Sequence, residues 1–304
     1  MTPTEPAIEV KALRKQYGAL TAVEDISFDV AAGECVALLG PNGAGKTTTT
    51  EILEGYRQPD AGIVRVLGVD PWRAPRAWKA RIGIVLQSDR DLGDLTVGEA
   101  IGHFARYYPD PLPVGEAIEA VGLTDKARSR NDRLSGGQRR RLDVALGIIG
   151  RPEVLFLDEP TTGFDPEARR EFWSLIESLR DRGTTILLTT HYLEEAEHLA
   201  DRVAVIARGR LLACASPADL GGRHDGQAEV GWLDGGRARS EWTERPTELV
   251  AALAERLGGE IPRLTIRRPS LEDTYLELIR GAETTDLDAT PHEDAALAAD
   301  RPQP

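Results

Sequence analysis

Short apolar runs alternate with amphipathic segments from Ala7 to about Ala215. Runs rich in β-branched and aliphatic residues predict strands, and segments with apolar positions at helical spacing predict helices between them. Such an order is typical of an α/β domain whose mixed, largely parallel sheet is covered by helices. The predicted strands include 33–39, 82–86, 154–157, 184–189 and 202–206, and the later helices are 166–182 and 192–199.

The alternation stops between about residues 89 and 152, where the pattern predicts helices only. These are Val97–Tyr107, Val114–Val121 and Gln138–Ile149. We therefore expect a helical subdomain, about residues 89–152, inserted into an α/β domain that spans residues 1–217.

The pattern of apolar and polar residues changes again after Pro217, where Gly221-Gly222 and Gly235-Gly236 interrupt a weakly patterned stretch. Helices are predicted at 247–257 and 270–280, so we expect a small α+β accessory domain over residues 218–280. Residues 281–304 are mostly Ala, Asp, Glu, Thr and Pro, which bury too little apolar surface to offset their ordering entropy. A disordered acidic tail is predicted there.

Composition indicates a soluble globular protein, with 41% hydrophobic and 29% charged residues. The apolar runs are far shorter than the roughly 20 residues of a membrane-spanning helix, and the first residues lack the pattern of a secretory signal. We therefore expect a cytoplasmic location. Cys35 and Cys214 lie in strand-like apolar runs, as buried cysteines of a reducing compartment do. A net charge of −13 disfavours a nucleic-acid partner.

The strongest candidate chemistry lies directly after the first buried strand. The segment fits the pattern of a P-loop and precedes a predicted helix, which is the context that this motif requires. Its glycines let backbone N–H groups and the helix N-terminus point at phosphates, Lys46 adds a positive charge, Thr47 suits Mg²⁺ and Thr48 a phosphate oxygen. The nine residues are Gly40, Pro41, Asn42, Gly43, Ala44, Gly45, Lys46, Thr47 and Thr48.

Three further segments follow the P-loop. Val154–Leu157 leads into Asp158 and Glu159, which suits one carboxylate for Mg²⁺ and the next for the attacking water. His191 ends another apolar strand, where it can contact the terminal phosphate and orient Glu159. Leu134-Ser135-Gly136-Gly137-Gln138, taken alone, is also compatible with a plain loop before a basic helix.

With these motifs in this order, residues 7 to about 217 resemble the nucleotide-binding subunit of ABC transporters. The resemblance implies a P-loop NTPase fold of the ABC type that binds ATP with Mg²⁺. It makes Ser135, Gly136, Gly137 and Gln138 the signature that contacts ATP, Asp158 the Mg²⁺ carboxylate, Glu159 the catalytic base and His191 the switch histidine.

The resemblance assigns three more residues, each with a structural alternative. Tyr17 matches the aromatic residue that stacks on adenine, or it packs in the first hairpin. Gln87 matches the glutamine that touches Mg²⁺ and senses the membrane partner, or it is a polar residue at a strand end. Asp165 matches the D-loop aspartate and is also a good helix N-cap before Pro166. Gly163-Phe164 departs from the commonest sequence of this loop in the family.

In this family ATP lies between the P-loop of one chain and the signature of another. The resemblance therefore implies a homodimer or heterodimer that drives a separately encoded membrane permease from the inner face of the cell membrane. Residues 267–278 are similar to the closing motif of daunorubicin-resistance exporter ATPases, which favours efflux of a drug, antibiotic or lipid. An amphipathic helix capped by Ser270 explains the same residues locally.

Two other functions are weighed against this one. A soluble ABC-type ATPase acting on ribosomes or DNA usually carries two cassettes or a long coiled coil, and neither pattern is visible. A P-loop kinase or GTPase leaves Leu134–Gln138 and His191 without a role. The cargo is not specified by the sequence, because the permease selects it.

Overall fold

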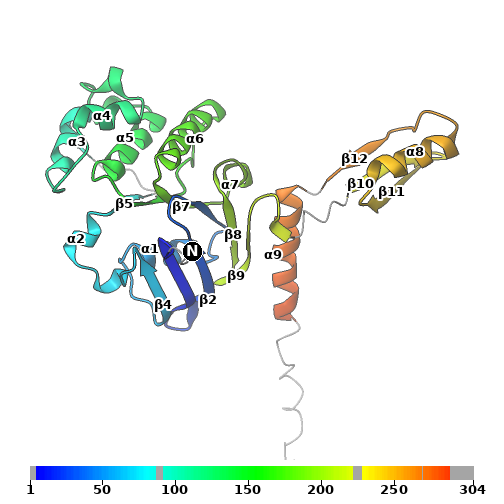
Figure 1. Ribbon diagram of the computed structural model, residues 1–304, viewed down its shortest axis with the longest axis horizontal. Coiled ribbons are helices and arrows are strands. Elements are labelled where there is room, and N and C mark those ends of the chain that lie inside the picture. Colours follow the sequence, from blue (N-terminus) through cyan, green and yellow to red (C-terminus); the bar gives the residue numbers. More distant parts are fainter. Residues whose placement is uncertain (1–4, 87–91, 222–227, 269, 288–304) are drawn as a thin grey trace, which may run out of the picture. The chain divides into compact units, whose positions relative to one another are not determined.

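The computed structural model describes residues 5–86, 92–221, 228–268 and 270–287. It divides into two compact units, Met1–His224 and Asp225–Pro304, a few residues after the expected boundary at Pro217. Figure 1 shows the elements of each unit.

The first unit is built on a nine-stranded sheet with the order β4-β1-β2-β9-β8-β3-β7-β6-β5. The pairs β3–β7, β3–β8, β6–β7 and β5–β6 are parallel, whereas β1–β2, β1–β4 and β8–β9 are antiparallel. The predicted α/β class with a mixed, largely parallel sheet is confirmed. The strands are β1 Ile8–Tyr17, β2 Leu20–Val30, β3 Cys35–Leu39, β4 Ala61–Val66, β5 Ile82–Val85, β6 Val154–Asp158, β7 Thr185–Thr190, β8 Arg202–Ala207 and β9 Arg210–Ala215.

The parallel order of β5, β6, β7 and β3 positions the site. Carboxyl ends of neighbouring parallel strands meet at one sheet edge, which is where ligands bind in open α/β sheets. The P-loop follows β3, Asp158 ends β6 and His191 follows β7. Residues far apart in the sequence are therefore brought to one edge by the topology.

Helices α1 (Lys46–Leu53), α6 (Pro166–Asp181) and α7 (Leu193–Leu199) follow β3, β6 and β7. Leu38, Ile52 and Phe156 are almost fully buried in one apolar core that joins α1 to the sheet. This packing fixes the P-loop at both ends, because its preceding strand and following helix belong to the same core.

The described residues between β5 and β6 form helices, as the sequence predicts. They are α3 (Val97–Ala105), α4 (Val114–Ala120) and α5 (Gly136–Ile148), which contact one another and lie together in Figure 1. α5 begins two residues before the predicted start, because Ser135 caps it. The short elements of this unit are α2 (Arg76–Lys79) and the 3₁₀ turns η1 (Pro71–Arg73), η2 (Thr124–Lys126) and η3 (Asn131–Arg133).

The second unit contains a three-stranded antiparallel sheet with the order β11-β10-β12 and two helices. Val230, Trp232, Leu253 and Ile261 form its own small core. The final helix continues to Leu287, so the prediction of disorder from residue 281 is wrong for the first part of that segment. Residues 288–304 lie outside the described residues. The elements are β10 Ala228–Asp234, β11 Arg237–Thr243, α8 Pro246–Leu257, β12 Thr265–Arg267 and α9 Leu271–Leu287.

Candidate active site

The loop between β3 and α1 requires glycine at two crowded positions. Gly45 has φ 101°, and a Cβ atom there would lie 2.5 Å from the Ala22 carbonyl oxygen. At Gly40 a Cβ atom would lie 2.1 Å from the Ile206 carbonyl oxygen. Because real Cβ atoms do not approach an oxygen so closely, the loop keeps its curl only with these glycines.

Lys46 lies in this loop as a buried cation. Its Nζ donates hydrogen bonds to the carbonyl oxygens of Gly40, at 2.8 Å, and Pro41, at 3.2 Å. Desolvation lowers the pKa of Lys46, and the nearby carboxylates of Glu159 and Asp158 oppose that shift. The lysine side chain is thus held against the start of the loop. The next two residues lie on the first turn of α1, with Thr47 exposed and Thr48 half-buried.

The two acids at the end of β6 occupy different settings. Asp158 accepts a hydrogen bond from the Thr189 hydroxyl on the neighbouring strand. Glu159 has a left-handed backbone with φ 42°, and its N–H donates to the carbonyl and hydroxyl oxygens of Thr189, each at 3.1 Å. A left-handed non-glycine residue costs free energy and persists only where its surroundings fix it, as functional sites often do.

Glu159 is the point at which three predicted site residues meet. Its Oε1 lies 3.9 Å from Lys46 Nζ, and its Oε2 lies 3.3 Å from His191 Nδ1. The Glu159 side chain is mostly buried, with 13% exposure, whereas His191 is more exposed. The arrangement places a carboxylate between the P-loop cation and an imidazole, which is a suitable geometry for polarising a water beside a bound phosphate.

The signature residues form the start of α5. Ser135 caps the helix: its hydroxyl accepts a hydrogen bond from the Gln138 N–H, and the Gln138 side chain accepts one from the Ser135 N–H. A Cβ atom at Gly136 would meet nothing within 4 Å, so the backbone there is open. Gly136 and Gly137 leave the helix N-terminus accessible to an anion.

One cavity of about 460 Å³ joins the signature to residues 159–165, which are called the catalytic loop because they contain the candidate base Glu159. Asp165 also lines this cavity. It is the N-cap of α6, and its carboxylate accepts hydrogen bonds from the N–H groups of Glu167 and Ala168. The capping interpretation of Asp165 is thus what the structure shows directly. No described P-loop residue lines this cavity, which is formed by Ser135, Gly136, Gly137, Arg140, Glu159, Pro160, Thr162, Gly163, Phe164, Asp165 and Ala168.

Tyr17 ends β1 with a partly exposed ring, and the charged ends of Lys15 and Arg57 lie 5.4 and 5.5 Å from the ring centroid. It pairs with Leu20 in the hairpin whose Ala22 carbonyl abuts Gly45. A partly exposed aromatic ring in this hairpin is suited to stacking on adenine. Gln87 lies outside the described residues.

Comparison with known proteins decides the family. A family model described as ABC transporter matches residues 23–162, a span that contains the P-loop, the signature and Glu159. The Nod factor export ATP-binding protein I of Paraburkholderia xenovorans is 47% identical over 221 residues, covering 71% of this chain and 73% of that protein. The chain belongs to the ABC transporter ATP-binding subunits. It is an ABC-type ATPase, and ATP is its nucleotide.

Other relatives extend the match of this ABC subunit. A Nod factor export ATP-binding protein I from a Rhizobium species is 38% identical over 298 residues, covering 90% of this chain and 96% of that protein. A match of that extent includes much of the segment after Pro217. A solved ATP-binding subunit of an ABC transporter has a TM-score of 0.66 at 24% identity over 90% of this chain and 99% of its own, which shows the shared fold.

The site of this ABC subunit fits Mg²⁺ bound together with ATP. The Thr47 hydroxyl and the Asp158 carboxylate are oxygen donors of the kind that Mg²⁺ prefers. Mg²⁺ usually keeps several waters and binds through one or two protein oxygens together with substrate phosphates, which suits these two donors. When bound, the ion would neutralise charge that develops on the phosphates.

Two buried side chains that carry no motif signal in the sequence support this ABC site. Arg140 on α5 is 4% exposed, although it lies in an Arg-Arg-Arg run that reads as a basic surface. Glu195 on α7 is fully buried, and burial raises the pKa of its carboxyl, whereas Thr190, Thr161 and Trp173 lower it. Helical spacing places Arg140 on the same face as the buried residue Val144, so its burial could have been predicted. The sequence pattern does not indicate which groups the Arg140 side chain contacts.

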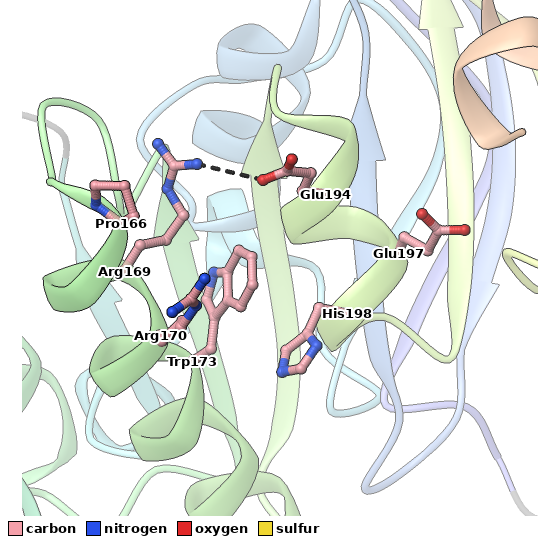
Figure 2. Close-up of a pocket in the computed structure, with 7 residues that line it drawn as sticks. All are labelled: Pro166, Arg169, Arg170, Trp173, Glu194, Glu197 and His198. Atoms are coloured by element: carbon pink, nitrogen blue, oxygen red, sulfur yellow. Dashed lines mark ion pairs between the residues drawn. The ribbon is translucent and has the colours of Figure 1, made fainter.

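A second cavity, of about 320 Å³, lies between α6 and α7 and is lined by Pro166, Arg169, Arg170, Trp173, Glu194, Glu197 and His198. Figure 2 shows Arg169, Arg170 and Trp173 on α6 facing Glu194 and His198 on α7. Arg169 pairs with Glu194 at 3.6 Å, and the Trp173 ring stacks on His198 with centroids 4.6 Å apart. These contacts join α6, which Asp165 caps, to α7, which follows His191.

Proposed function

We propose that this chain is the ATP-hydrolysing subunit of an exporter of the daunorubicin-resistance type and that it drives a separate membrane permease. The observation that supports hydrolysis is that Lys46 and His191 both lie close to the Glu159 carboxylate. Similarity over most of the chain to proteins named Nod factor export ATP-binding protein I supports export. We further propose that the cargo is a drug, antibiotic or lipid and that the subunit works at the inner face of the membrane.

Each site residue receives a defined task in this proposal. The backbone N–H groups of residues 40–48 and Lys46 hold the β- and γ-phosphates, while Thr47 and Asp158 supply oxygen ligands for Mg²⁺. Glu159 accepts a hydrogen bond from the attacking water, and His191 orients that carboxylate and contacts the γ-phosphate. Positioning and charge stabilisation then lower the barrier to phosphoryl transfer.

We propose a two-chain site, with the signature of one chain completing the ATP site of the other. The lining of the signature cavity supports this, because it includes Glu159 and Asp165 but no described residue of the P-loop. Tyr17 would stack on adenine, and Gln87 would contact Mg²⁺ and sense the permease. Two ATP molecules then close a homodimer or heterodimer, and hydrolysis reopens it.

Replacing Glu159 with Gln tests the chemistry and the assembly together. Glutamine keeps the shape of the side chain but removes the negative charge that polarises water, so we expect hydrolysis to fall by about 10²–10⁴-fold. ATP binding persists, so the variant accumulates as a closed dimer. Steady-state ATPase activity and gel filtration in ATP measure both effects.

Glu153→Gln is the matched control, because Glu153 precedes the same strand and pairs with Arg81 on the surface. It should hydrolyse ATP like the wild type. A Glu159→Gln variant that hydrolyses normally and stays monomeric in ATP would overturn the proposed base and the two-chain site.

A purification from solubilised host membranes tests the transport role. Tagged Glu159→Gln chain in ATP should co-purify with an integral-membrane protein that lacks a P-loop of its own. Recovery with ribosomes or DNA instead would favour the soluble ABC-type ATPase. Among the described residues, no helix has both the length and the apolar character to cross a bilayer.

A further inference from the structure

The side chain of Arg140 binds three backbone carbonyl groups. Its Nε donates to the Pro160 oxygen at 3.0 Å, its Nη2 to the Asp158 oxygen at 2.8 Å, and its Nη1 to the Leu86 oxygen. The Asp143 carboxylate lies 4.0 Å away, at the edge of ion-pair distance. Hydrogen bonds to the main chain therefore stabilise the buried charge.

The three carbonyl groups all belong to segments that carry catalytic residues. Asp158 and Pro160 flank Glu159 on either side, and Leu86 directly precedes Gln87. Arg140 thus donates hydrogen bonds to the main chain on both sides of the proposed base.

A guanidinium group is suited to this task because its planar fork of N–H donors has a fixed geometry. Three acceptors bound to one plane cannot move independently of one another. A lysine ammonium at the same place is a point charge with freely rotating donors, so it keeps the charge but loses the fixed relation between the acceptors.

Arg140 also moves with the signature, because both belong to the first turns of α5. The helix begins at Gly136, directly after the Ser135 cap, and Arg140 is one turn further along on the same continuous helix. A displacement of the signature by a bound phosphate is therefore carried to Arg140, and from there to the carbonyl groups around Glu159.

We propose that Arg140 is a positioning residue that couples the signature loop to the catalytic loop of the same chain. This inference rests on the proposed two-chain site, in which the signature contacts the ATP held by the partner. Nucleotide at the partner's P-loop then sets the position of Glu159 beside this chain's own ATP. Arg140 is the physical link that makes hydrolysis at the two ATP sites cooperative.

Arg140→Lys tests the coupling while keeping the buried charge. We expect the dissociation constant for ATP to stay within about twofold and kcat to fall by roughly ten- to a hundredfold, equivalent to losing one or two charge-assisted hydrogen bonds. The Hill coefficient for ATP should fall towards one. Arg141→Gln is the matched control, since Arg141 lies on the same helix and pairs with Glu171 instead; its kcat and Hill coefficient should remain those of the wild type.

A second variant separates this inference from the proposed function. Glu159→Gln combined with Arg140→Lys should still form the ATP-dependent dimer on gel filtration, because Arg140 positions the base and does not bind nucleotide. Failure of Glu159→Gln alone to dimerise would overturn the two-chain site. Dimerisation of Glu159→Gln together with wild-type kcat and Hill coefficient in Arg140→Lys would overturn the coupling alone. Loss of ATP binding in Arg140→Lys would also overturn it, by reducing Arg140 to a structural residue.

Discussion

Glu159 carries both the proposed chemistry and a strained backbone. Its φ of 42° is enforced by two hydrogen bonds from its N–H to Thr189, and Arg140 holds the carbonyl groups on both sides. The strain aims the carboxylate at the space between Lys46 and His191. Local sequence around Glu159 does not require this conformation, so the fold must supply it.

Glu54 provides a prediction at the scale of a single residue. It is 5% exposed at the end of α1, and desolvation, with smaller effects of Asp158 and Glu51, raises the pKa of its carboxyl to about 8. Between about pH 4.5 and pH 8, the folded protein therefore retains a proton that the unfolded chain has already released. Stability contributed by this site is complete below that window and is lost as pH rises through it.

Glu54→Gln removes the titration. Its free energy of unfolding relative to the wild type should rise between about pH 5 and about pH 8 by on the order of 2–4 kcal/mol. Urea denaturation of both proteins at the two pH values measures the difference. A difference that is the same at both values would show that Glu54 does not carry the proton.

Motif residues can be predicted from the sequence, whereas the residues that position them cannot. The P-loop pattern and its context predict Lys46, and the occurrence of several motifs in order predicts Glu159 and His191 as site residues. Arg140 cannot be identified in this way. Its acceptors are carbonyl groups from separate places in the sequence, which become neighbours only when β5 and β6 pair.

At the scale of elements, capping explains where two helices begin. α5 starts at Gly136 because Ser135 and Gln138 form a capping box, and α6 starts at Pro166 because Asp165 accepts two backbone N–H groups. Both caps coincide with residues of the candidate site. Helix initiation and the proposed contact with ATP therefore constrain the same positions.

Asp165 allows these two constraints to be separated. Asp165→Ala should lower the free energy of unfolding by about 1 kcal/mol, because two N–H groups lose their acceptor. Asp165→Asn keeps an oxygen acceptor, so its stability should stay close to the wild type. Both variants should hydrolyse ATP severalfold more slowly, because Asp165 lines the cavity shared with Glu159 and the signature. Thermal melts and ATPase assays would show this, and wild-type hydrolysis by Asp165→Asn would confine Asp165 to capping.

Helices and buried strands are predictable at this scale, but the β10–β11 hairpin is not. Buried runs such as Val154–Leu157 are almost wholly apolar and stand out in any hydropathy pattern. β11 has no such signal, since nearly all of its residues are exposed and polar or charged residues predominate. Its pairing with β10 depends on the Gly235-Gly236 turn, which in the sequence pattern is only an interruption.

At the scale of the whole molecule, the chain contains two units with separate apolar cores. The change in sequence pattern after Pro217 indicates this division, and the candidate site residues all belong to the first unit. Trp232 is the largest side chain in the core of the second. Its removal should therefore weaken one unit selectively.

Trp232→Ala should destabilise the second unit by about 3–5 kcal/mol through lost burial and the cavity left behind. Differential scanning calorimetry should show a lower melting transition for that unit and an unchanged one for the first, with ATPase activity retained. Trp242→Ala is the control, because that ring is 51% exposed. Loss of hydrolysis in Trp232→Ala alone would show that the second unit controls the first.

The separate core of the second unit also has an evolutionary consequence. A substitution that disturbs Val230 or Leu253 is absorbed within that small core, while the sheet edge that holds Lys46 and Glu159 keeps its packing. Selection can then reshape the second unit at a different pace from the first. Descendants of one ancestral ATPase could acquire new tasks there and inherit the hydrolytic machinery unaltered.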